Sequence, residues 1–214
     1  MTEDRDWRTV YDFWFPPGLD DAGAETHHHM FAWWFGGGAN KELPRFAPVL
    51  DAARAGRLRH WLATPRGRLT LIVVLDQFPR SLLAGTPAAY ASDPDALSVA
   101  EEGLRNGHYD ALAKPWERTF FFMPLGHAEG QDHRARLERV AVMAELIALE
   151  TPQHLRPLYR FSAGQARPPR GDRPLRQVPP PQPHPRASVH AGGGGLPGEG
   201  RPRAHAAAAT RVRG

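Results

Sequence analysis

Two oppositely charged residues lie inside the most apolar stretch of the chain, at a spacing that would let them meet. Asp76 and Arg80 are four positions apart, so both side chains fall on one face of a continuous helix. We expect the pair to be partly buried and to need further partners, such as Gln77, because an unpaired buried charge is costly. Two interpretations stay open. The pair is either an ion pair that locks the helix at Pro79, or the floor of a polar pocket in which Arg80 binds an anion and Asp76 acts as base or orienting group.

A second candidate cluster follows Pro124, at the end of an aromatic helix. His127 and Glu129 would face different ways on a helix but could converge in a loop. A histidine oriented by a carboxylate serves acid–base chemistry or metal binding. The alternative is a helix-terminal histidine that bonds only to the backbone. We expect Asp76, Arg80 and His127 to approach one another only if the segments that carry them form one site.

Two further runs could carry chemistry, but a structural role is favoured for each. Residues 27–29 are three consecutive histidines, which chelate a metal poorly without fixed partners, so we expect them in a surface loop. The run Trp33-Trp34-Phe35 precedes three glycines, and we expect it in the core rather than in an aromatic ligand platform. We predict no metal site, and the sequence names no cofactor.

Several classes of protein are excluded or disfavoured by what the sequence lacks. There is no cysteine, so disulfides and thiolate chemistry are absent. The charged N-terminal residues lack the apolar region of a signal peptide, and no apolar run is long enough to span a bilayer. Phosphate-binding loops, dinucleotide fingerprints and the common hydrolase and zinc-protease motifs do not occur. We therefore expect a cytoplasmic protein with no membrane partner.

Charge and composition change near residue 165. Residues 1–164 carry a net charge of −3 and residues 165–214 one of +7, which together give the +4 of the chain. The second segment holds 10 prolines and 8 glycines and no Ile, Phe, Tyr, Trp or Met, so it cannot bury enough apolar surface to offset chain entropy. We predict a helical domain over residues 1–166 and a disordered tail over residues 167–214. The faintly acidic domain disfavours nucleic acid as a partner.

The apolar residues of the first segment follow helical spacing throughout. Thr64, Asp93 and Thr151 each precede a proline, a pattern typical of helix starts. After Thr64, an apolar stripe predicts a central, mostly buried helix that Pro79 should kink or break near residues 77–78. Further helices are predicted over residues 46–55, from Asp93 to the Asn-Gly pair at 106–107, from Pro115 until Pro124 intervenes, and over residues 137–148. No strand alternation appears, so we predict an all-α fold of antiparallel helix pairs.

Several ordered motifs resemble one family. The segments WLATPRGRL at 61–69, LDQFPR at 75–80, GTPAAY at 85–90, PWERTF at 115–120 and MPLGHAE at 123–129 are similar to the bacterial domain of unknown function 924 family over residues 10–165. Asn40, Ser81 and Ala128 depart from its usual pattern. The resemblance implies a tetratricopeptide-like helical fold. It implies no activity, because none is established for the family.

The tail departs from this family in a way that indicates a change of reading frame. The family ends with a block similar to RFGKFPHRN, a linker, and then STPEE and an apolar helix. Codons compatible with residues 175–183 read FGKFPHRN when translated one base later, and residues 189–197 permit STPEEEAFL at the same offset. Two agreements in one order and one frame predict a frameshift between residues 164 and 170.

These observations favour a helical binding or scaffold protein whose polar pocket holds Asp76, Gln77, Arg80, His127 and Glu129. A small molecule or another protein would be its partner. The alternative is a small-molecule enzyme, hydrolytic in type, that uses His127 with Asp76 or Glu129. An open cleft containing Asp76, Arg80 and His127 would favour the enzyme, whereas a closed ion pair remote from His127 would oppose it.

Overall fold

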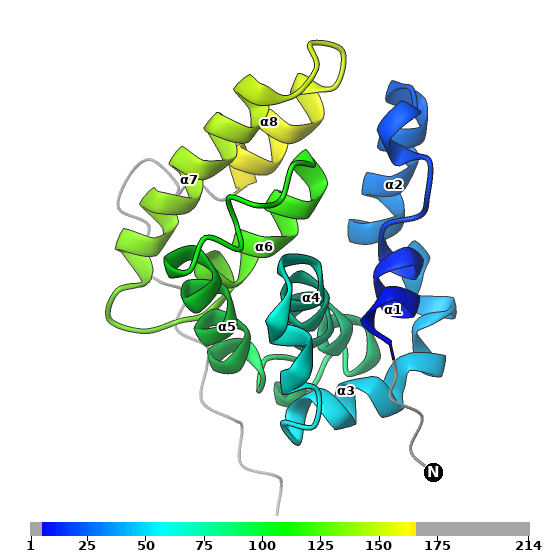
Figure 1. Cartoon of the computed structure of the whole chain (residues 1–214), viewed down its shortest axis with the longest axis vertical. Coiled ribbons are helices and arrows are strands. Elements are labelled where there is room, and N and C mark those ends of the chain that lie inside the picture. The colour runs from blue at the N-terminus through cyan, green and yellow to red at the C-terminus, as the bar shows by residue number, and fades with distance from the viewer. Residues whose placement is uncertain (1–5, 166–214) are drawn as a thin grey trace, which may run out of the picture. The chain divides into compact units, whose positions relative to one another are not determined.

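The all-α prediction is confirmed for the part of the chain that the computed structural model describes, residues 6–165. Eight α-helices joined by short loops and 3₁₀ turns make up this part, and it contains no strand (Figure 1). The helices are α1 (Trp7–Trp14), α2 (Ala24–Phe35), α3 (Ala47–Arg54), α4 (Pro65–Leu82), α5 (Asp93–Arg105), α6 (Pro115–His127), α7 (His133–Glu150) and α8 (Arg156–Gln165). The predicted tail over residues 167–214 lies outside the described residues.

Helix α4 is the buried centre of the fold, as its apolar stripe predicts. Its N-cap is Thr64, whose hydroxyl accepts a hydrogen bond from the amide of Gly67 at 3.1 Å. Every residue from position 67 to position 79 is buried. Helices α1, α3, α5 and α6 all pack against α4, so the polar residues of its buried stretch, Asp76 and Gln77 among them, lie among other helices rather than in solvent.

Two internal prolines do not end their helices: of the kink or break expected at Pro79, the break is wrong, and the end expected at Pro124 is wrong as well. Helix α4 continues through Pro79 to Leu82, and α6 continues through Pro124 to His127. A proline removes only one backbone hydrogen bond, and burial of both helices compensates for that loss. The carbonyl groups of both prolines still accept the regular helical bonds, at 2.9 Å and 3.1 Å.

Aromatic side chains from α1, α2, α4 and α6 form much of the core. Trp14, Trp34, Phe78 and Phe120 are all buried and touch one another edge to face or tilted. The core placement expected for the run at 33–35 is confirmed for Trp34. Its neighbours are less buried, since Trp33 packs partly buried against the core and Phe35 is half exposed but stacks on Phe120.

The surface-loop prediction for residues 27–29 is wrong. The three histidines belong to α2, and His27 is completely buried, while His28 and His29 are exposed. His27 faces the core beside Trp116 and bonds through Nε2 to the carbonyl of Leu19 at 3.0 Å. Helical periodicity explains the difference, because consecutive residues of a helix cannot all face solvent when one side of it is packed.

Helices α4 to α8 each pack against the next one in the chain, as expected for successive helix pairs. The stop at Asn106 and Gly107 is confirmed, since α5 ends at Arg105 and Gly107 has a φ of 81°. Thr151 does not start a helix as predicted. It ends α7, and its hydroxyl donates back to the carbonyl of Ile147.

None of the described helices is long and apolar enough to cross a membrane.

Candidate active or binding site

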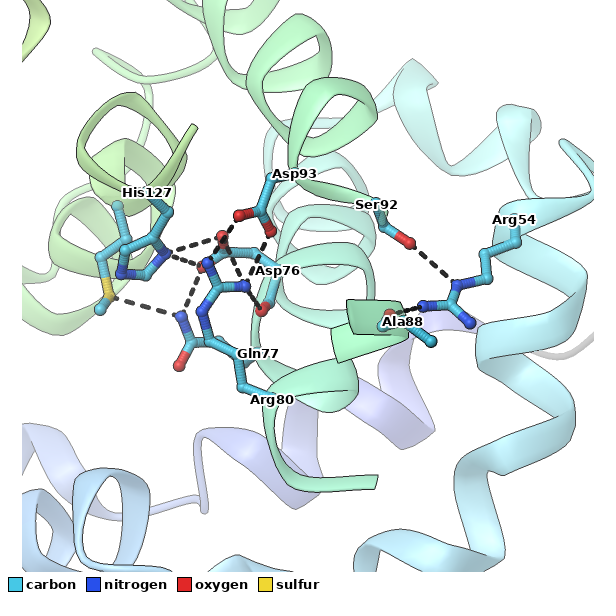
Figure 2. Close-up of polar contacts among 9 residues, drawn as sticks. Arg54, Asp76, Gln77, Arg80, Ala88, Ser92, Asp93 and His127 are labelled. Carbon is cyan, nitrogen blue, oxygen red and sulfur yellow. Dashed lines mark hydrogen bonds and ion pairs between the residues drawn. The ribbon is translucent and has the colours of Figure 1, made fainter. Parts of the chain in front are cut away.

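A buried carboxylate holds the imidazole of His127 across the contact between α4 and α6. Asp76 is fully buried, whereas His127, the last residue of α6, keeps 28% of its side chain exposed. His127 Nδ1 lies 2.8 Å from Oδ1 and 2.9 Å from Oδ2 of Asp76 (Figure 2). Gln77 Nε2 donates to Oδ2 of the same carboxylate at 2.5 Å. Gln77 is therefore the partner that the sequence indicates for Asp76.

Arg80 pairs mainly with a residue that the sequence does not single out as a site residue. Its guanidinium donates from two nitrogens to the two oxygens of Asp93, each at 2.9 Å, in a bidentate pair. It also donates to the backbone carbonyl of Asp76 at 2.6 Å, while the carboxylate of Asp76 is farther away, at 3.6 Å. Burial lowers the pKa of Arg80, but the bonds to Asp93 and the charge of Asp76 outweigh it and raise this pKa.

Arg54 of α3 anchors the segment that brings Asp93 to Arg80. Its guanidinium donates to the hydroxyl of Ser92 at 2.9 Å and to the carbonyl of Ala88 at 2.8 Å (Figure 2). Ser92 rather than Asp93 occupies the N-cap position of α5. The predicted N-cap at Asp93 is therefore off by one residue, and this shift leaves the Asp93 carboxylate free to bind Arg80.

The polar cluster borders an open pocket with a volume of about 660 Å³. Arg80, Asp93 and His127 lie on its wall, and Asp76 lies behind His127. The remaining lining residues come from the segment before α5, from α5 itself, from the end of α6, from the turn after it and from the start of α7; they are Tyr90, Pro94, Leu97, Gly126, Ala128, Glu129 and His133. A pocket of this volume suits a small molecule.

The predicted site residues are brought together, with one difference in their pairing. Asp76, Gln77, Arg80 and His127 form one connected network. Glu129 lines the same pocket but is exposed and makes no hydrogen bond or ion pair with the described residues, so the carboxylate that orients His127 is that of Asp76.

The sequence did not predict three of the polar or aromatic pocket residues, which are Tyr90, Asp93 and His133. Asp93 resembles a helix cap in sequence, and its true role depends on where the 87–93 segment lies. Tyr90 is part of the GTPAAY motif, and the Arg80 guanidinium lies 5.5 Å from the centre of its ring. Nothing in the spacing of His133 marks it as a pocket residue.

The network leaves one nitrogen of His127 available for chemistry. A carboxylate only accepts hydrogen bonds, so Nδ1 carries a proton and donates it to Asp76. In the neutral ring, Nε2 then bears a lone pair, and it has no partner among the described residues. This arrangement is typical of a histidine that accepts or donates a proton. The described residues contain no group of three His, Cys, Asp or Glu side chains arranged to hold a metal ion.

Comparison with known proteins assigns most of the described chain to one family. Residues 10–163 match the profile of a family described as a bacterial protein of unknown function, DUF924. The chain belongs to this family. A chain of known structure, the protein of unknown function ATU0120 from Agrobacterium tumefaciens, is 29% identical to it. The alignment covers 74% of this chain and 82% of that one, with a TM-score of 0.52, and no curated protein matches.

Three of the five motifs that resemble DUF924 supply residues of the pocket or of the polar network behind it. The LDQFPR segment supplies Asp76 and Arg80, the GTPAAY segment supplies Tyr90, and the MPLGHAE segment supplies His127 and Glu129. The condition set by the sequence, that these segments share a site, is therefore met. Family membership assigns no reaction to that site, since both the family and the solved relative are of unknown function.

Proposed function

We propose that this protein binds a small polar molecule in the pocket and exchanges a proton with it through His127. One observation carries the proposal: the buried Asp76 carboxylate orients an imidazole whose Nε2 has no partner among the described residues. A carboxylate–histidine pair is costly to build into a helix interface, because Asp76 must be desolvated and then compensated by Gln77 and His127. A purely structural ion pair would not need a histidine that keeps 28% of its side chain exposed.

A small-molecule binding screen tests this proposal. We expect polar fragments to raise the melting temperature of the wild-type protein and to shift its pocket resonances in NMR spectra. The Leu97→Trp variant, which fills the pocket, should lose these shifts. The His127→Asn variant should weaken binding about tenfold or more, the loss of one charge-assisted hydrogen bond. His29→Asn, which changes an exposed histidine of α2, is the matched control. Fragments that bind Leu97→Trp as well as wild type would refute the proposal.

A hydrolytic enzyme is the second candidate, favoured by the same free Nε2, which could hold and activate a water molecule. Among the described residues, no Ser, Thr or Cys lines the pocket, and we propose that a water molecule bound at Nε2 is the nucleophile. Turnover of chromogenic esters and phosphates tests it. His127→Asn and Asp76→Asn should each lower any rate by about 100-fold or more, as general bases contribute at least that much. Turnover that survives both substitutions would exclude a role for this pair.

We further propose a cytoplasmic location and a partner that is a small molecule or another protein rather than a membrane or nucleic acid. The described residues contain no membrane-spanning helix, and residues 1–164 carry a net charge of −3, which does not favour polyanions. Fractionation of the native cells tests the location.

A further inference from the structure

We infer that the pocket selects a small organic cation, such as a primary amine, over neutral and anionic molecules. The inference rests on the proposed binding function and concerns the chemistry of the ligand. It is argued from the hydrogen-bonding state of the unpaired groups, from the charge around the pocket and from its aromatic wall.

The unpaired nitrogen atoms of the pocket are hydrogen-bond acceptors. His127 Nδ1 donates to a carboxylate, and His133 Nδ1 lies 2.9 Å from the carbonyl of Ala128, which also only accepts. Both neutral rings therefore carry their proton on Nδ1 and a lone pair on Nε2. Glu129 adds a carboxylate without a protein partner among the described residues. The two Nε2 atoms and the Glu129 carboxylate are therefore three acceptors suited to a ligand that donates hydrogen bonds.

The charge around the pocket points the same way. Arg80 is the one permanent cation among the lining residues, and its bidentate pair with Asp93 matches that charge. Glu129 then leaves the lining with a net charge of −1, and behind the lining the charges of Asp76 and Arg136 cancel in the count. Arg136 lies nearby, outside the lining, and donates to the carbonyl groups of Leu125 and Ala128. An anion would meet the unpaired carboxylate of Glu129 here, whereas a cation would be stabilised by it.

The wall of the pocket suits an organic cation rather than a metal ion. Tyr90 is 60% exposed, and its ring already attracts one cation, the Arg80 guanidinium at 5.5 Å from the ring centre; an aromatic ring at the pocket wall also suits a cationic ligand. Pro94 and Leu97 offer apolar surface for a hydrocarbon body. The acceptors are too dispersed to coordinate one metal ion, since no three such side chains of the described residues form a cluster. A ligand of several atoms can bridge them.

Calorimetric titration with three four-carbon probes tests the inference: putrescine, its diol analogue and succinate. We expect putrescine to bind at least about tenfold more tightly than the diol, and succinate not to bind. Glu129→Gln should weaken putrescine binding by about tenfold, because it removes the unpaired carboxylate and keeps the shape. The matched control is Glu138→Gln, which changes an exposed carboxylate paired with Arg134 on α7 and should leave binding unchanged.

The outcomes separate the ligand class from the existence of a binding pocket. If succinate or the diol binds as tightly as putrescine and Leu97→Trp blocks it, the cation inference is overturned and the proposed function stands. Putrescine binding that is unchanged in Glu129→Gln also overturns the inference. If none of the three probes gives a heat of binding, the cation inference is overturned, whereas the proposed function is decided by the fragment screen with wild type and Leu97→Trp.

Discussion

At the scale of single residues, Asp76 decides which nitrogen of His127 carries the proton. In Asp76→Asn, the side-chain amide can donate to Nδ1, which would move the proton of the neutral ring to Nε2 and remove the free acceptor. We expect ¹⁵N NMR spectra of the imidazole to show an Nδ1–H ring in the wild-type protein and an Nε2–H ring in the variant. Identical tautomers in both proteins would mean that Asp76 does not orient His127.

His27 gives a second residue-scale prediction, on the pH dependence of stability. It is buried with Nδ1 unpaired, and burial lowers its pKa below the ordinary value. The unfolded chain therefore takes up a proton more readily, so stability that is fully present above about pH 6.5 is lost as the pH falls through the folded pKa. The free energy of unfolding should fall by up to about 1.4 kcal/mol per pH unit, the limit for uptake of one proton on unfolding.

Urea denaturation at pH 7 and pH 5 measures this effect. His27→Gln, which cannot be protonated, should show a smaller drop in the free energy of unfolding than wild type between the two pH values. His28→Gln changes an exposed neighbour on the same helix and should behave like wild type. An equal drop in wild type and His27→Gln would show that His27 does not titrate with folding.

At the scale of the elements, the site depends on how closely α5 approaches α4 and α6. Gly103 of α5 lies where a Cβ atom would be 2.4 Å from the ring of Phe121 and 2.6 Å from Cδ of Arg68. Gly103→Ala gains about 1 kcal/mol in helix propensity, but we expect overpacking of about 1–3 kcal/mol to outweigh it. The free energy of unfolding from urea denaturation should therefore fall.

A glycine in the neighbouring helix is the control for this prediction. A Cβ atom at Gly126 of α6 would have no neighbour closer than 3.7 Å, which is an ordinary contact. Gly126→Ala should therefore leave stability unchanged or raise it by up to about 1 kcal/mol. Destabilisation by both substitutions would show that the effect at Gly103 is not specific to its close packing.

At the scale of the whole molecule, α7 exposes an apolar face. Val142, Leu146 and Leu149 are 61%, 53% and 50% exposed, and their i, i+4, i+7 spacing places them in one stripe. Exposed apolar area on this helix is the consequence expected if a frameshift removes the apolar C-terminal helix that the family resemblance implies. The frameshift itself stays a prediction, and sequencing of the DNA decides it.

Restoring the reading frame tests the consequence for stability. If the restored segment covers the stripe on α7, the melting temperature should rise by roughly 2–4 °C for each kcal/mol gained, and binding of a hydrophobic dye should fall. The two proteins would be compared by scanning calorimetry at one concentration. Equal melting temperatures and equal dye binding would show that the restored segment does not pack against the apolar stripe of α7.

The amino-acid sequence alone determined what depends on local spacing. Thr64 and the apolar stripe after it specify a helix whose interior must be buried, and the four-residue separation of Asp76 and Arg80 makes their side chains neighbours. These features follow from the 3.6-residue repeat, so they need no knowledge of distant parts of the chain. The boundaries at internal prolines were less predictable, because packing outweighs the loss of a single hydrogen bond.

Only the tertiary structure decided which partners these residues take. His127 reaches Asp76 across 51 positions of sequence, and Asp93 reaches Arg80 across 13, through a segment that Arg54 holds in place. The burial of His27 likewise depends on the core that α2 packs against. Such contacts are set by where helices cross, and a sequence pattern specifies which face of a helix is apolar but not which residues of another helix lie opposite it.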